Sequence, residues 1–402
     1  MKNSYKLLYI LVLFLVFYSF KAWMFVGGSV SWSFYVAPLL ILLSLSNTKL
    51  FSFTNEKIIF IVLSFVVFGY ERGLHDFGGV IGAVFDMTAL YVIVLLNEKN
   101  RCKLLEWFDK IMLPITAVSV VWWILYLLHV PLPHHDFDWI ISEESYYHFE
   151  NYYLFLFCVQ DAVINIFPRF SSIFYEPGYS AIILVFLLLY HKFDFHKRAV
   201  QIYSVALFFT FSLSGFVMFF LMWGGFSLCK SAKGIPYLLC LIVLLYGGQV
   251  FFKDYNNGDN PVNELILARL EIEDGNIAGY NRTGKTFDDD FEDFIKRGDS
   301  HVYFGAPKGM VKSMNLANVG WKVYFYVNGL VCFVFFLFCV WLVFSPYKKK
   351  VFCALPMILY LLTFARGHRV MWFSGYWLLW VGIMSFFNSD NLKKIEFKKS
   401  SK

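Results

Sequence analysis

Arg169 and Glu176 stand close together in the chain, directly before an apolar run, and this spacing suits the binding of an anion. The segment 169–177 reads RFSSIFYEP, so that Pro177 opens the run. Proline suits the first turn of a helix, where its missing N–H costs nothing, and Glu176 then takes the cap position. An arginine beside a helix N-terminus is a natural clamp for a phosphate or diphosphate. The structural alternative is that Glu176 caps the helix and pairs with Arg169.

A second group of arginines lies in the polar stretch 253–318, at Arg269, Arg282 and Arg297. The guanidinium fork binds a diphosphate better than a lysine ammonium does. The same stretch contains twelve acidic residues, however. Each of these arginines therefore has two interpretations, as a ligand for a diphosphate or as one half of a surface ion pair.

Charged residues also stand at the edges of apolar runs. Arg366 and Arg369 flank His368 in a very short polar turn. An arginine near bilayer depth costs about 2.5–3.5 kcal/mol by insertion scales, so either a function or snorkelling to the interface explains it. Arg72 is a similar, weaker case. Asp86 lies inside an apolar run, where a carboxylate is either functional or a helix-packing hydrogen bonder.

Signatures for metals and nucleotides are poor. The runs HHDFD at 134–138 and DDDFED at 288–293 contain suitable atoms but lack the spacing of a metal site. The chain has no Walker loop, GxGxxG, HExxH or GxSxG motif. Its seven cysteines form no CxxC pair and fall mostly in apolar runs, which indicates packing. No cofactor is expected, and the energy for any reaction must arrive with the substrate.

The composition predicts which elements position these residues. Hydrophobic residues make up 58% of the 402 positions, charged residues 16%, and the mean hydropathy is +0.57. Because backbone groups within lipid must be paired internally, we expect an all-α polytopic membrane protein. A span needs about 20 residues. The predicted spans are 7–26, 31–46, 58–70, 80–96, 111–130, 178–190, 199–213, 215–229, 235–252, 319–344, 351–365 and 370–387, twelve in all.

Two segments decide that count. The apolar run 199–229 is too long for one ordinary helix, so we expect a tight hairpin at 212–215. The segment 152–167 is apolar but contains Gln160, Asp161 and Asn165, and it is predicted to be a re-entrant or interfacial piece. Counting it as a span would place the basic C-terminal tail outside, against the positive-inside rule.

The distribution of positive charge predicts the topology. With both termini inside, the cytoplasmic segments contain 21 of the 35 lysines and arginines. The net charge of +6 is therefore a topology signal and not a sign of nucleic-acid binding. Residues 1–402 form a single membrane domain in this prediction. Its two large outer loops are 131–177 and 253–318.

The second outer loop is predicted to be ordered and folded back onto the membrane domain. It is too long for a mere connector. Phe287, Phe291, Phe294 and Ile295 would share one face of a helix, and that face needs a partner to cover it.

Three motifs of the chain resemble those of Wzy-type O-antigen polymerases. RFSSIFYEPGYSA at 169–181 is similar to the segment with arginine and Glu-Pro that precedes a span in that family. FTFSLSGF at 209–216 resembles the family's Ser-rich hairpin. The stretch from Arg269 through Asn281 and Arg282 to YFGAPKG at 303–309 resembles its second large periplasmic loop.

This resemblance implies a glycosyltransferase with a GT-C-like bundle, in the bacterial inner membrane. Its donor would be a glycan on undecaprenyl diphosphate, and its acceptor one repeat unit on the same carrier. The implied partners are those lipid-linked units, membrane lipid and a separate chain-length regulator. Neither a metal nor a cofactor is implied.

The resemblance also implies roles for individual residues. Arg169 and Arg282 would bind the diphosphate. Glu176 would orient or deprotonate the acceptor hydroxyl, or only cap its helix. The further candidates for substrate binding are Arg269, His301, Arg366 and Arg369.

Two other functions fit the same architecture. O-antigen ligases use a periplasmic His-Asn pair, whereas Asn315 and Asn318 have no adjacent histidine here and His301 is only the nearest substitute. A transporter, or a flippase for lipid-linked oligosaccharides, would be expected to carry charges within its spans and to have short outer loops. This chain shows the opposite pattern, which favours the polymerase.

Overall fold

The computed structural model describes residues 4–25, 30–73, 76–142, 145–161, 168–230, 251, 255, 272–273, 276–277, 285–307, 320–367 and 371–400. The chain divides into two compact units. Unit 1 comprises Met1–Ser19, Val30–Glu106 and Arg282–Lys402, and unit 2 comprises Phe20–Ser29 and Trp107–Asn281. The single membrane domain over 1–402 stays a prediction.

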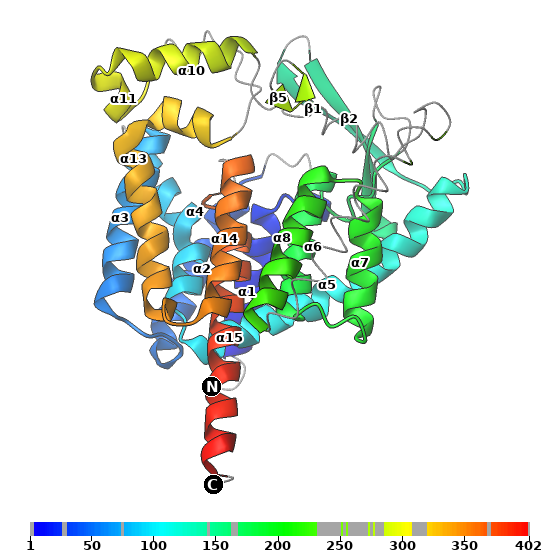
Figure 1. Ribbon diagram of the computed structural model, residues 1–402, viewed down its shortest axis with the longest axis horizontal. Coiled ribbons are helices and arrows are strands. Elements are labelled where there is room, and N and C mark those ends of the chain that lie inside the picture. Colours follow the sequence, from blue (N-terminus) through cyan, green and yellow to red (C-terminus); the bar gives the residue numbers. More distant parts are fainter. Residues whose placement is uncertain are drawn as a thin grey trace. The chain divides into compact units, whose positions relative to one another are not determined.

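The named elements of unit 1 in the described residues are helices (Figure 1), and one isolated β-bridge joins Phe51 to Leu96. Its helices are α1 (Ser4–Ser19), α2 (Trp32–Ser46), α3 (Asn55–Arg72), α4 (Phe77–Leu95), the start of α5 (Glu98–Leu127), α10 (Lys285–Arg297), α11 (Ser300–Phe304), α13 (Trp321–Phe344), α14 (Val351–Arg366) and α15 (Ser374–Ser400). The short 3-10 helices η2 (Thr48–Leu50) and η7 (Ser345–Tyr347) join them.

Unit 2 combines helices with small sheets. It contains the rest of α5, then β1 (His135–Ser142), β2 (Ser145–Tyr152), the 3-10 helix η3 (Tyr153–Phe155), β3 (Phe157–Asp161), α6 (Pro177–Tyr190), α7 (Arg198–Phe209), α8 (Leu213–Lys230), β4 (Ile272–Glu273) and β5 (Asn276–Ile277). The 3-10 helix η1 (Trp23–Phe25) also belongs to it.

Eleven of the twelve predicted spans coincide with a helix in the described part of the chain; the twelfth, 235–252, falls almost entirely outside it. Within the described residues, four helices are long and apolar enough to cross a membrane, namely α4, α5, α8 and α13 with η7. Shorter apolar helices are α1, α2, α6, α7 and α14. The protein is thus mostly helical and suited to a membrane, and twelve spans stay a prediction.

The predicted hairpin is confirmed, whereas one predicted span is shorter than expected. Helix α7 ends at Phe209 and α8 begins at Leu213, so the chain turns at the Ser-rich segment. The span predicted over 7–26 ends as a helix at Ser19. Lys21 and Trp23 have φ of 53° and 51°, and the Trp23 N–H donates to the Ile173 carbonyl at 2.6 Å. These left-handed residues divert the chain from the helical path.

The described residues 152–161 of the predicted re-entrant or interfacial piece belong to a three-stranded antiparallel sheet, β1–β2–β3, and to η3. The sequence did not predict these strands, and the position of the segment at a membrane stays a prediction. Aromatic rings line the pairing: Phe137 lies opposite Phe149, with ring centroids 5.1 Å apart. Tyr152 stacks on Phe157 with centroids 4.4 Å apart. Figure 1 shows β1 and β2, in teal, above α6 and α7.

Helix α13 is broken at Gly329, so the predicted span 319–344 is two helical segments. Gly329 has a φ of 79°, and the carbonyls before it lose their helical partners. The Ala306 N–H donates to the freed Tyr326 carbonyl at 2.8 Å. Asn328 Nδ2 donates to the Tyr324 carbonyl at 3.2 Å. The chain after α11 thus supplies a hydrogen-bond donor for a carbonyl that the break leaves unpaired.

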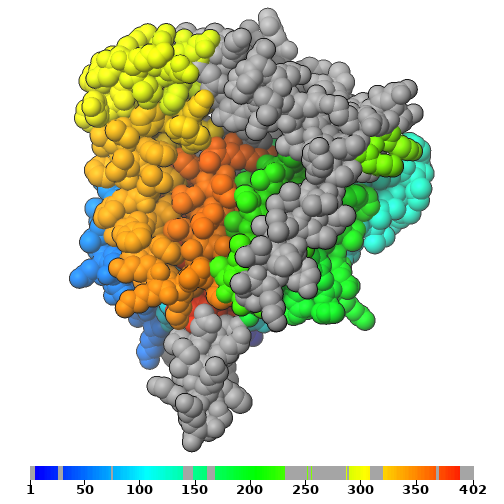
Figure 2. Space-filling model, in the orientation of Figure 1, coloured from blue at the N-terminus to red at the C-terminus, as the bar shows by residue number. Residues whose placement is uncertain are grey.

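The predicted docking of an amphipathic helix is confirmed for α10 against α13. Phe287, Phe291 and Phe294 are buried, and each ring contacts Phe325 or Tyr326 of the first part of α13. The prediction was wrong for Ile295, which is exposed because it lies off this face. Figure 2 shows α10, in yellow, covering the first part of α13.

Gly329→Ala is expected to destabilise unit 1. A Cβ there would lie 2.4 Å from the Tyr303 carbonyl oxygen and 2.5 Å from the Gly305 nitrogen, and the φ of 79° would be strained as well. We expect a loss of about 2 kcal/mol or more, measured as a fall in unfolding temperature in detergent.

Gly298→Ala is the matched control. Gly298 also has a positive φ, 61°, but a Cβ there meets no atom within 4 Å. The Gly298→Ala variant should lose only about 1 kcal/mol of stability, which is the cost of placing alanine in this backbone conformation. Equal losses in the two variants would contradict the close contact at the break.

Candidate functional site

The loop before α6 is held by two backbone hydrogen bonds and by two buried aromatic rings. The Cys158 N–H donates to the Ser172 carbonyl at 2.9 Å, which attaches the loop to β3. The Phe170 N–H donates to the Phe209 carbonyl at 3.0 Å, which attaches it to the end of α7. Phe170 and Phe174 are fully buried and anchor the loop through their rings. The segment 168–176 is therefore a fixed part of unit 2.

Arg169 lies at the C-terminal end of α7. Its Nε donates to the Thr210 carbonyl at 2.9 Å, and the side chain is half-buried. A cation is favourable at this position, because the last carbonyls of a helix carry partial negative charge. Thr210 begins the turn that leads directly into α8. Arg169 is thus fixed beside the hairpin that the sequence singled out.

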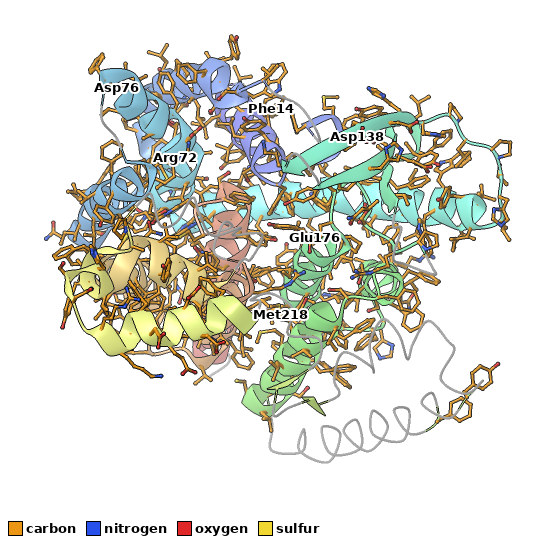
Figure 3. All side chains as sticks on the ribbon, turned by 90° about the horizontal axis from the view of Figure 1, so that it is seen from above. Phe14, Arg72, Asp76, Asp138, Glu176 and Met218 are labelled. Carbon is orange, nitrogen blue, oxygen red and sulfur yellow. The ribbon has the colours of Figure 1, made fainter. Side chains whose placement is uncertain are left out.

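Two helices start side by side next to this arginine. Helix α6 begins at Pro177 and α8 at Leu213. A Cβ added to Gly215 would lie only 2.5 Å from the Ala181 Cβ, so the first turns of the two helices are in close contact. Figure 3 shows α6 and α8, in green, next to each other, with Glu176 at the start of α6. The positive dipole ends of the two helices therefore lie at the same end of unit 2, where the Gly215 N–H already donates to Ser212 Oγ at 3.3 Å.

Buried hydroxyls line the same region. The Ser172 and Ser180 Oγ atoms are buried and have no hydrogen-bond partner among the described residues. Ser172 also has a φ of 53°, a conformation that costs about 1 kcal/mol or more for a residue other than glycine. By contrast, the neighbouring Ser171 hydroxyl donates to the Cys158 carbonyl. Buried polar groups are nearly always paired, so these two hydroxyls are available to a polar partner.

Glu176 takes the predicted cap position without making the predicted capping bond. Its φ and ψ of −128° and 127° are those of a cap residue, and Pro177 follows at the first turn. Its carboxylate makes no hydrogen bond to the backbone of the first turn of α6 in the described structure. The side chain is half-buried. Glu176 therefore occupies the cap position by its backbone conformation, and both interpretations of its side chain stay predictions.

Only part of the predicted site can be placed. Arg169 and Glu176 belong to one loop of unit 2. His301 lies in α11 of unit 1, where its N–H binds Asp299 Oδ1 at 2.9 Å and its side chain is exposed. Arg366 is the last residue of α14, a favourable position for a cation. The remaining predicted residues, Arg269, Arg282 and Arg369, lie outside the described residues.

Asp86 and Arg72 of unit 1 form an ion pair. Arg72 Nη2 lies 3.0 Å from Asp86 Oδ2, and Ser33 Oγ donates to Asp86 Oδ1 at 2.6 Å. The Arg72 guanidinium also lies over the Phe68 ring, 4.9 Å from its centroid. Of the two interpretations of Asp86, the helix-packing hydrogen bonder is the one that the structure supports. Figure 3 shows Arg72 in the helix pair α3–α4.

The chemistry of Glu71 was missed by sequence reasoning. Its carboxylate accepts hydrogen bonds from the Tyr324 hydroxyl at 2.7 Å and from Trp372 Nε1 at 2.9 Å. These donors come from α13 and from the segment before α15, about 250 and 300 positions away in the chain. The only signal in the sequence was an acidic residue at the end of a predicted span. The cluster joins three elements of unit 1 through one carboxylate.

The described part of the sheet in unit 2 contains groups whose pKa burial raises. Burial first, and then the hydrogen bond to Glu150, raise the pKa of the Tyr152 hydroxyl. Burial raises the pKa of the Cys158 thiol to about 12, so this cysteine is no nucleophile at neutral pH. The HHDFD run forms β1, where Asp138 binds His148 Nδ1 at 2.7 Å. Among the described residues, no group of three His, Cys, Asp or Glu side chains is arranged to hold a metal ion.

Gly215→Ala is expected to push the starts of α6 and α8 apart. The added Cβ would overlap that of Ala181, and overpacking of this kind costs about 1–3 kcal/mol. Gly82→Ala is the control, since its Cβ would meet the Phe34 ring at an ordinary 3.8 Å. The measurement is the unfolding temperature of both variants. A Gly215→Ala protein as stable as the control would contradict the close approach of the two helices.

Searches against protein families, curated proteins and solved structures found no match for the chain. No residue role is therefore taken from a matched relative. The roles of Arg169 and Glu176 rest on the geometry of unit 2 and on the resemblance of the motifs around them.

Proposed function

We propose that this protein is a glycosyltransferase that polymerises O-antigen or a related surface polysaccharide. It transfers the growing glycan from undecaprenyl diphosphate to a hydroxyl of a new lipid-linked repeat unit. The reaction takes place at the periplasmic face of the bacterial inner membrane. Twelve spans in a GT-C-like bundle, with both termini in the cytoplasm, form the protein in this proposal.

One observation carries the proposal: Arg169 and the starts of α6 and α8 meet at one end of unit 2. An arginine with two adjacent helix N-termini supplies fixed positive potential, which the carbonyl end of α7 that Arg169 contacts offsets in part. A lipid diphosphate requires this when it departs, since negative charge builds up on the leaving oxygen in the transition state. The unpartnered Ser172 and Ser180 hydroxyls suit a polar substrate such as a sugar.

The proposed reaction balances without a cofactor. The bond between the anomeric carbon of the growing chain and the diphosphate oxygen breaks, and a bond from that carbon to the acceptor oxygen forms. The proton of the acceptor hydroxyl passes to a base, and undecaprenyl diphosphate leaves. The donor is already activated, which agrees with the missing nucleotide motifs.

Glu176 is the candidate that orients or deprotonates the acceptor hydroxyl. It stands at the start of α6 in the same loop as Arg169. A positioned carboxylate base contributes about 10²–10⁴-fold to such a transfer. Arg282 and Arg269 stay further candidates for the diphosphate on the resemblance alone, and His301, Arg366 and Arg369 for substrate binding.

Arg169→Ala is expected to abolish polymerisation in the cell. In a host strain without the gene, surface lipopolysaccharide on a gel should show a core carrying a single repeat unit and no ladder. The wild-type gene should restore the ladder, whereas genes with Arg169→Ala or Arg282→Ala should not. The physical reason is the lost charge on the departing diphosphate, worth about 10²–10³-fold in rate.

Arg198→Ala is the matched control for Arg169→Ala. Arg198 is an exposed arginine at the start of α7, away from the turn that Arg169 contacts, and its variant should restore the ladder. A deletion strain with no repeat unit on its core would overturn the polymerase proposal and favour ligation or flipping. A full ladder from Arg169→Ala would remove this arginine from the site.

Ser172→Gly is expected to weaken activity without weakening the fold. Glycine adopts a φ of 53° at no steric cost, so stability should hold or rise. The lost hydroxyl should lower polymerisation by about tenfold, the value of one hydrogen bond to substrate. Ser171→Ala should lower stability and leave the activity of the folded protein unchanged, because that hydroxyl donates to the Cys158 carbonyl within the protein. Full activity of Ser172→Gly would show that its hydroxyl contacts no substrate.

A further inference from the structure

Unit 1 contains a cavity of about 440 Å³ that the proposed transfer does not use. It lies between the start of α3, the junction of α4 and α5, and the end of α13 with η7. Its charged lining residues are Glu56, Lys57, Glu98, Arg101 and Lys348. The charge pattern of the sequence predicts that this end of unit 1 faces the cytoplasm.

Arg101 is the residue that makes this cavity unusual. Its side chain is only 3% exposed, yet it has no ion pair among the described residues. Its Nη2 donates to the Tyr347 hydroxyl at 2.9 Å, while its Nε is buried without a partner in the described structure. An unpaired buried cation is costly, so arginines at such depth normally bind an anion.

Lys57 adds a second cation beside Arg101, and the charge of Glu98 offsets part of the effect on it. Its Nζ donates to Ser52 Oγ at 2.6 Å and lies 3.3 Å from the carbonyls of Leu95 and Leu96. It precedes the predicted span 58–70. Burial first, and then the charge of Arg101, lower the pKa of the Lys57 ammonium to about 7. An anion in the cavity would remove this penalty and restore the charge.

The two carboxylates of the cavity leave this positive charge in excess. Both oxygens of Glu98 accept from Asn388 Nδ2, at 2.9 and 2.8 Å, so α15 holds this carboxylate. Glu56 is exposed to solvent, where screening weakens its effect. Lys348 supplies a third cation, on an exposed side chain at the rim.

We propose that this cavity binds a phosphate group, with Arg101, Lys57 and Lys348 as its ligands. A planar guanidinium and two ammonium groups match the several acceptor oxygens of a phosphate. The volume lies within the range of small-ligand pockets, about 300–1,000 Å³. Two sources offer this chemistry at a cytoplasmic membrane surface: the headgroup of an anionic phospholipid and a soluble phosphate compound.

The test uses the purified full-length protein in nanodiscs of phosphatidylcholine. In one arm, part of the lipid is replaced by phosphatidylglycerol. In the other, inorganic pyrophosphate is titrated into the phosphatidylcholine nanodiscs. The readout in both arms is the shift of the unfolding temperature, followed by tryptophan fluorescence. We expect a rise in at least one arm for the wild type, because a ligand that binds only the folded state stabilises it.

Variants assign the shift to the cavity. Lys57→Gln and Lys348→Gln should each weaken binding by about tenfold, the loss of one charged contact. Lys49→Gln is the matched control, since Lys49 lies in the neighbouring η2 and does not line the cavity. Lys348 is exposed, so Lys348→Gln should fold as the wild type does. It therefore still tests the site if Lys57→Gln fails to fold.

Each outcome decides the proposal. A shift with phosphatidylglycerol alone assigns a lipid headgroup, and a shift with pyrophosphate as well assigns a phosphate site open to soluble ligands. No shift in either arm overturns the proposal, as does a shift of equal size in Lys348→Gln and the wild type.

Discussion

The close contact between Gly215 and Ala181 is the constraint on which the candidate site depends. Because Gly215 has no side chain, α6 and α8 start side by side and their positive dipole ends lie together. The loop 168–176 leads directly into the first of these two helices. Its hydrogen bonds to β3 and to the end of α7 fix Arg169 and Glu176 there. A positive site is thus built largely from backbone, with one arginine added.

In unit 1, a glycine and an internal ion pair have comparable structural roles. Gly329 lets α13 break, and the chain after α11 supplies the hydrogen bond that the break removes. Arg72 and Asp86 neutralise each other between α3 and α4. Arg101 is the exception, since its buried charge has no such partner among the described residues. That contrast supports a ligand for Arg101, separate from the chemistry proposed for unit 2.

The sequence predicted most helices and the Arg169–Glu176 loop, because long apolar runs and a Glu-Pro pair are local signals. It missed the sheet at 135–161, where aromatic and polar residues alternate too irregularly to indicate strands. It missed the break at Gly329, since a single glycine in an apolar run is ordinary. The Glu71 cluster was beyond reach for another reason. Its donors Tyr324 and Trp372 approach only after distant helices have packed.

The most direct measurement of the central claim is the stoichiometry of the reaction in the test tube. Purified protein in nanodiscs would be given repeat units linked to undecaprenyl diphosphate, and both polymer and released carrier would be quantified. The proposed transfer predicts one undecaprenyl diphosphate released per new glycosidic bond, with no nucleotide added, and a loss of both products with Arg169→Ala. Repeat units that stay unlinked in the presence of folded wild-type protein would contradict the account.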